Sequence, residues 1–122
     1  MRSIRIRRMR PDSIRLEFSR DRLGRGVLRL TGPLTLNNLF GFQREVRADS
    51  SALLIIEFSG VPYIDSAGLG ALIGAQVSRQ KDGRQMVLAG VTDRVLSTLR
   101  MTNVEQFFTI VPGLEDTESS AS

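Results

Sequence analysis

The sequence contains no cysteine and no histidine, and these absences exclude several kinds of chemistry. Without cysteine there is no disulfide bond and no thiolate zinc site. Without histidine there is no Ser-His-Asp or Cys-His nucleophile system and no histidine-ligated metal centre. Lys81 is the only lysine, and it lies about four helical turns from the nearest candidate nucleophile, Ser66. We therefore expect no enzymatic activity and no cofactor.

Long apolar segments are also lacking. No apolar run approaches the roughly 18 residues that a membrane-spanning helix needs. The N-terminus has the arginines of a signal peptide but not its apolar centre. These features predict a cytoplasmic protein with no membrane span.

The net charge of +4 is concentrated at one end of the chain. Residues 1–30 hold ten arginines and three acidic residues, whereas the remainder is net acidic. Residues 1–12 form a basic N-terminal arm with two interpretations: a contact for nucleic acid, anionic lipid or an acidic partner, or a solvated extension. The arm has no aromatic residue that would stack on bases, so we expect no direct nucleic-acid binding.

A chain of 122 residues has the length of one domain. We assign that domain to residues 13–113. The segment 114–122 is acidic and rich in serine, with almost nothing to bury, and is predicted to be a disordered tail.

The hydrophobic pattern predicts an α/β domain with a mixed sheet. Its expected strands are 13–19, 27–30, 52–58, 85–90 and 107–111, and the first two are expected to form a hairpin. The expected helices are 35–48, 69–81 and a third that starts after Thr92 and stops at Asn103. Thr35 and Thr92 are predicted caps, and Gly83 is predicted to end the second helix in a left-handed conformation. Four side chains of the first helix are expected to face inward: Leu36, Leu39, Phe40 and Val46.

The segment 61–70, VPYIDSAGLG, is the centre of this pattern. It joins the apolar strand 52–58 to the second helix, and Asp65 and Ser66 stand where the strand gives way to the helix. Gly68, Gly70 and Gly74 follow within two to three turns. Because glycine costs a helix about 1 kcal/mol relative to alanine, we expect the backbone to pack closely against a neighbour there.

The run Asp-Ser-Ala-Gly-Leu-Gly, followed by a helix, Asp82-Gly83, an apolar strand and a helix-strand pair, resembles the STAS domain. More narrowly, it is similar to the bacterial anti-sigma factor antagonists. The resemblance covers about residues 14–112. It implies a single-domain STAS-like sandwich with a mixed central sheet of about five strands and three to four helices.

The resemblance also implies a function. The family's serine at the position of Ser66 is phosphorylated by a cognate anti-sigma factor that is also a protein kinase of the GHKL type. The unphosphorylated antagonist binds this kinase and so releases the sigma factor, the phosphorylated form dissociates, and a phosphatase restores it. Asp65 matches the preceding acidic residue, and Gly68, Leu69 and Gly70 match the start of the recognition helix.

We expect the partner to contact three parts of the surface: the Asp65-Ser66 turn, the exposed side of the second helix, and the loop after the second strand. The predicted contact residues are Asp65, Ser66, Ala67, Gly68, Leu69, Gly70, Pro33, Thr35, Gln76 and Arg79, with Gln80 beside them. Thr35 stands where the family usually has aspartate. The protein itself is expected to be a monomer or a weak dimer.

Three functions remain open on the sequence alone. The first is the antagonist controlled at Ser66, which would regulate sigma-factor-dependent transcription. The second is a non-switching STAS scaffold or an accessory subunit of a stress-signalling or lipid-transport complex. The third is nucleic-acid binding through the arginine arm, with a steep salt dependence that would disappear when residues 1–10 are deleted.

Overall fold

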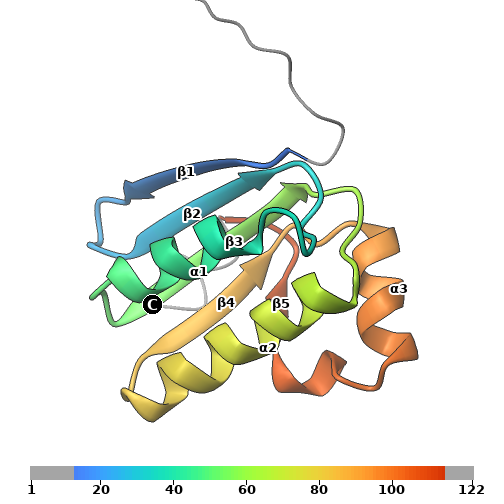
Figure 1. The fold of residues 1–122 in the computed structure, drawn as a ribbon. Coiled ribbons are helices and arrows are strands. Elements are labelled where there is room, and N and C mark those ends of the chain that lie inside the picture. Colours follow the sequence, from blue (N-terminus) through green and yellow to red (C-terminus); the bar gives the residue numbers. More distant parts are fainter. Residues whose placement is uncertain (1–12, 115–122) are drawn as a thin grey trace, which may run out of the picture.

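The computed structural model describes residues 13–114, so the predictions for the basic arm and for the tail after Leu114 lie outside the described residues. The predicted α/β architecture is confirmed (Figure 1). The elements in chain order are β1 (Arg15–Arg20), β2 (Gly26–Thr31), α1 (Leu39–Ala48), β3 (Leu53–Gly60), α2 (Ser66–Lys81), β4 (Gln85–Ala89), α3 (Asp93–Met101), the short 3₁₀ helix η2 (Glu105–Phe107) and β5 (Thr109–Val111).

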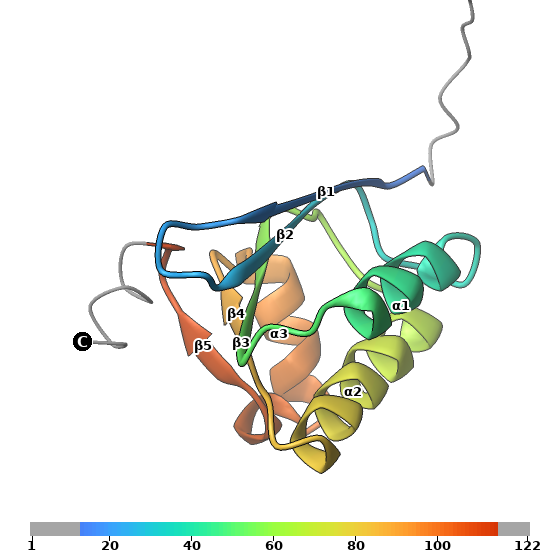
Figure 2. The same ribbon diagram turned by 90° about the vertical axis from the view of Figure 1, so that its left-hand side faces the viewer.

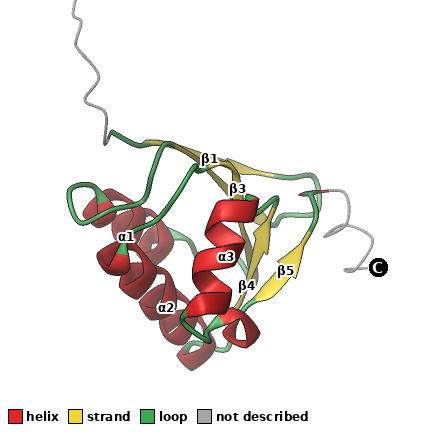
Figure 3. Ribbon diagram, turned by 90° about the vertical axis from the view of Figure 1, so that its right-hand side faces the viewer, coloured by secondary structure: helices red, strands yellow, loops and turns green. Residues whose placement is uncertain are grey.

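The five strands form one mixed sheet in the order β1-β2-β3-β4-β5. β1 and β2 are antiparallel, as predicted for a hairpin, whereas β2, β3, β4 and β5 are parallel to their neighbours. Each parallel connection requires a crossover segment, and such crossovers share one hand. Accordingly, α1, α2 and α3 cover the same face of the sheet and make a two-layer molecule (Figures 2 and 3).

The main core lies between the sheet and the three helices. Its fully buried large side chains include Leu28, Leu54, Ile56, Leu88, Phe42, Leu72 and Leu99. Because successive strand residues point to opposite faces, Val27, Ile55 and Ala89 form a second, smaller cluster on the other face of the sheet. Burial on both faces explains why the sequence of β3 is apolar without alternation.

The predicted end of α2 and both predicted ends of α3 are confirmed, whereas α2 begins at Ser66, before the predicted start at residue 69. Thr92 caps α3 by accepting a hydrogen bond from the backbone of Val95. Gly83 follows α2 with φ +71°, and Asn103 follows α3 with φ 61°, so both adopt the left-handed conformation that ends a helix.

The start of α1 differs from the prediction. The helix begins at Leu39 and not at Thr35, because Asn38 has a non-helical φ of −138° and its side chain bonds back to Thr35 and Pro33, which closes a separate turn before the helix. Leu34 forms an isolated parallel bridge with Ile64, and the backbone N–H of Leu36 donates to Asp65. Leu36 and Phe40 consequently point to solvent, which contradicts their predicted inward orientation.

Candidate functional site

Three loops meet at the carboxyl edge of the parallel strands: residues 32–38 after β2, 61–65 after β3 and 90–92 after β4 (Figure 1). The first two are joined by backbone hydrogen bonds, in which Leu34 donates to Tyr63 and Asp65 donates to Leu34. The third is tied to the second by the hydroxyl of Thr92, which donates to the carbonyl of Val61 over 2.9 Å. In open α/β sheets this edge is where binding sites gather.

Asp65 links the edge together. It is the N-cap of α2, and its Oδ1 accepts a 2.7 Å hydrogen bond from the backbone of Gly68. Its Oδ2 accepts a second bond, of 3.1 Å, from the backbone of Leu36. One carboxylate therefore stabilises the first turn of α2 and also fixes the segment that leads into α1.

Ser66 is the first residue of α2, and its side chain is exposed. Because Asp65 provides the cap, the Ser66 hydroxyl is not needed for it, and no hydrogen bond to a described residue involves that hydroxyl. Serine is itself a favoured helix cap. The structure assigns the cap to Asp65.

The close packing predicted from the glycines is present at one of them. A Cβ on Gly68 would overlap the backbone carbonyl oxygen of Leu34. A Cβ on Gly70 or Gly74 would meet no atom within 4 Å. Gly68 and Leu69 are buried, whereas Gly70 is exposed and Ala67 is half-buried.

The expected exposure of Gln76 and Arg79 is wrong. Gln76 is only 8% exposed, because its amide donates to the carbonyl of Phe107, in η2, over 2.6 Å. Arg79 is 3% exposed. Helical spacing cannot show which side of a helix a later segment covers, and η2 and the start of β3 cover this side. Gln80 is exposed, as predicted.

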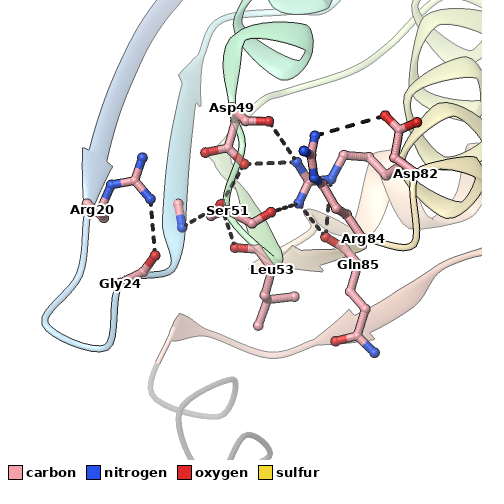
Figure 4. A network of polar contacts seen from close by, with 10 residues as sticks. Arg20, Gly24, Asp49, Ser51, Leu53, Asp82, Arg84 and Gln85 are labelled. Carbon is pink, nitrogen blue, oxygen red and sulfur yellow. Dashed lines mark hydrogen bonds and ion pairs between the residues drawn. The ribbon is translucent and has the colours of Figure 1, made fainter.

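Arg79 belongs to a buried polar network at the opposite edge of the sheet (Figure 4). Its guanidinium forms an ion pair of 2.8 Å with Asp49, at the end of α1, and donates to the carbonyls of Ser51 and Gln85. Ser51 in turn donates to Asp49. This network holds the end of α2 against the starts of β3 and β4. It lies away from the edge of the sheet that carries Ser66.

Pro33 and Thr35 are also buried, contrary to the prediction that their loop presents them to a partner. Thr35 is 6% exposed because the segment around it lies against the loop 61–65. Two large apolar residues further along the chain, Leu36 and Phe40, are exposed instead. Sequence reasoning missed them because both are apolar and fit the spacing of a helix that starts at Thr35.

A third residue that the sequence did not indicate is Arg94, in the first turn of α3. Its guanidinium lies over the ring of Tyr63, 5.1 Å from the ring centroid. Tyr63 stands three residues before Ser66. No sequence motif marks this pair, since the two residues are brought together only by the adjacency of β3 and β4.

The described residues contain no group of three or more potential metal ligands. Within the same residues, no helix is long and apolar enough to cross a membrane.

Comparison with known proteins gives consistent matches. The model of the STAS domain family matches residues 17–121. An anti-sigma-B factor antagonist of Staphylococcus aureus is 24% identical over 70 residues, which is 57% of this chain. The matched part spans 65% of the length of that relative.

Among solved structures, an anti-sigma factor antagonist from Mycobacterium paratuberculosis superposes with a TM-score of 0.79 at 21% identity, covering 91% of this chain and 96% of that one. The Bacillus cell fate determinant SpoIIAA in its phosphorylated form superposes with a TM-score of 0.69 at 12% identity, covering 88% of this chain and 100% of that one. These superpositions establish a shared fold.

Proposed function

The chain belongs to the STAS domain family, and from this membership we propose that it is an anti-sigma factor antagonist that a cognate anti-sigma factor kinase binds and then inactivates by phosphorylating Ser66. Two of the relatives named above are anti-sigma factor antagonists, and the solved structure of a third, SpoIIAA, is of its phosphorylated form. In this proposal the protein acts in the cytoplasm as a binding switch and a kinase substrate, and a phosphatase that acts on phospho-Ser66 resets it.

The position of Ser66 is the observation that carries the proposal. Its side chain is exposed at the first position of α2. Asp65 satisfies the Gly68 N–H that a serine cap would otherwise bind, so the Ser66 hydroxyl is free to enter an active site. A buried or hydrogen-bonded serine would not be accessible to a kinase.

A phosphate at this position acts on binding through its charge. It adds about −1.5 to −2 charges at neutral pH. The partial positive charge of the helix N-terminus favours an anion there by about 0.3–1 kcal/mol, so the fold tolerates the modification. Across an interface, by contrast, like charges cost several kcal/mol. About 5.5 kcal/mol is enough to change a partner from about 99% to 1% bound.

The test begins with intact-mass spectrometry and site mapping of the protein from its native host. Pull-downs with Ser66→Ala and Ser66→Asp then follow, and Ser78→Asp is the matched control. Ser78 is an exposed serine on the same helix, about 18 Å further along its axis. We expect a phosphate on Ser66, a GHKL-type kinase bound to the Ala variant and to the Ser78→Asp variant, and loss of that kinase from Ser66→Asp.

Two results together would overturn the switch: no phosphate on Ser66 under any growth condition, and the same partners for both Ser66 variants. Stable partners that bind Ser66→Ala and Ser66→Asp equally well would support the non-switching scaffold or accessory subunit instead.

A further inference from the structure

Two large apolar side chains near the start of α1 are exposed, and the backbone of one of them, Leu36, bonds to Asp65, the neighbour of Ser66. Leu36 is 62% exposed and Phe40 is 65% exposed, and they lie four residues apart where the loop 32–38 leads into α1. Most apolar residues of this size in the described chain are buried in the core. Adjacent exposed apolar side chains on a small protein are a feature of interaction surfaces.

The chain holds Leu36 at a fixed place relative to Ser66. The backbone of Leu36 donates to the carboxylate of Asp65, whose other oxygen caps the helix that Ser66 begins. Leu34, two residues earlier, is bridged to Ile64. A protein that engages the Ser66 hydroxyl therefore meets Leu36 within the same contact, because a typical interface buries about 800 Å² on each partner.

A cation lies at the same edge. Arg94 is exposed and stacks on Tyr63, and none of the ion pairs among the described residues involves it. Stacking on an aromatic ring orders a guanidinium before binding, which reduces the entropy lost when it pairs with a carboxylate. The acid that the family usually has near this edge is replaced here by Thr35, which is buried and neutral. Of the charged side chains at this edge, the Asp65 carboxylate accepts two backbone N–H donors, and Asp93 and Arg94 are exposed neighbours in the first turn of α3.

We propose that the kinase that phosphorylates Ser66 docks on a surface formed by Leu36, Phe40 and Arg94, which we call the Leu36–Arg94 surface. This kinase presents an apolar pocket bordered by a carboxylate. The assignment rests on the proposed function and specifies its partner. A phosphate on Ser66 would then face the partner's carboxylate, so that the charges that favour the unphosphorylated complex oppose the phosphorylated one.

The experiment uses the kinase that the Ser66→Ala protein recovers. This kinase is purified in the presence of ADP, and its affinity for full-length variants of the chain is measured. The test variants are Leu36→Ala, Phe40→Ala and Arg94→Ala in the Ser66→Ala background. The matched controls are Arg22→Ala and Leu23→Ala, two exposed residues in the β1–β2 turn at the other edge of the sheet. Thermal unfolding of each variant verifies that it is folded.

We expect Leu36→Ala and Phe40→Ala each to weaken binding by tenfold or more, and both controls to stay within twofold. Arg94→Ala should also reduce the dependence of the association rate on salt, because it removes a charge that attracts the partner. Test variants that bind like the controls would overturn the inference. So would sedimentation showing that these residues hold two copies of the chain together.

The two proposals fail in different ways. If the Ser66→Ala protein recovers no kinase, the proposed function fails before the surface is tested. If Ser66→Ala binds the kinase, Ser66→Asp does not, and the Leu36, Phe40 and Arg94 variants behave like the controls, the switch stands and only the surface is misassigned.

Discussion

At the scale of single residues, Gly68 is the position where the candidate site depends on the absence of a side chain. A Cβ there would overlap the carbonyl oxygen of Leu34, which is backbone and cannot rotate away. We predict that Gly68→Ala destabilises the protein by more than about 2 kcal/mol, since the loop and helix must separate. Gly74→Ala is the matched control on the same helix. It should stabilise by about 0.5–1 kcal/mol, because its Cβ meets nothing within 4 Å.

Urea unfolding measures both glycine variants. If Gly68→Ala proved as stable as wild type, the close contact between α2 and the loop 32–38 would be wrong, and with it the fixed position of Leu36 beside Ser66.

Arg79 is a residue whose buried charge contributes to the stability of the fold. Arg79→Met leaves the carboxylate of Asp49 buried without its cation, and Oδ1 of that carboxylate already lacks a hydrogen-bond partner among the described residues. Breaking a buried ion pair in this way costs about 3–5 kcal/mol. Arg84→Met is the control, because Arg84 is half-buried and only loosely paired with Asp82, so it should change stability by at most about 0.5 kcal/mol.

The measurement is again the free energy of unfolding in urea. A loss below about 1 kcal/mol for Arg79→Met would mean that water or a rearranged side chain replaces the guanidinium, and that the network is not needed to hold α2 in place.

At the scale of elements, the β1–β2 hairpin contains a titratable turn. Burial by itself raises the pKa of Asp21, but hydrogen bonds from the backbone and guanidinium of Arg25 and from the backbone of Leu23 outweigh it and hold that pKa below its ordinary value. A lowered native pKa means that the stabilisation is present above the ordinary pKa of about 3.9 and is lost as the pH falls through the native value.

Asp21→Asn should therefore be less stable than wild type at pH 7, and the difference should shrink below about pH 4. Urea unfolding at pH 7 and at pH 3 measures this difference. Glu17→Gln on β1, whose pairing with Arg15 is long and exposed, should change little at either pH. An Asp21→Asn deficit that is equal at both pH values would show that the turn depends on shape and not on charge.

The elements also show what the sequence can and cannot predict. The strand at β1, the apolar run of β3 and the end signals at Gly83 and Asn103 are local, and the structure confirms them, although Phe18 on β1 is exposed. The start of α1 was placed too early because Asn38 closes a turn with Pro33 and Thr35 before the helix, and this segment is also tied to Asp65, which lies 29 residues away from Leu36. The burial of Gln76 and Arg79 likewise depends on segments that come later or earlier in the chain. Ser66 was found through its motif, whereas Leu36, Phe40 and Arg94 needed the tertiary arrangement.

At the scale of the whole molecule, a phosphate on Ser66 should have different effects on folding and on binding. The fold should persist, whereas the interface with the kinase should be lost. Ser66 is exposed, and its neighbour Asp65 already holds the Gly68 N–H, so an added negative charge displaces no buried contact. Repulsion from Asp65 and attraction to the helix N-terminus act in opposite directions, each on the order of 1 kcal/mol or less. We predict that Ser66→Asp and the stoichiometrically phosphorylated protein unfold within about 1 kcal/mol of wild type, with the same urea dependence, while kinase affinity falls at least a hundredfold. A loss of more than about 2 kcal/mol, or a changed urea dependence, would mean that the phosphate acts by opening the carboxyl edge and not by repulsion across an intact interface.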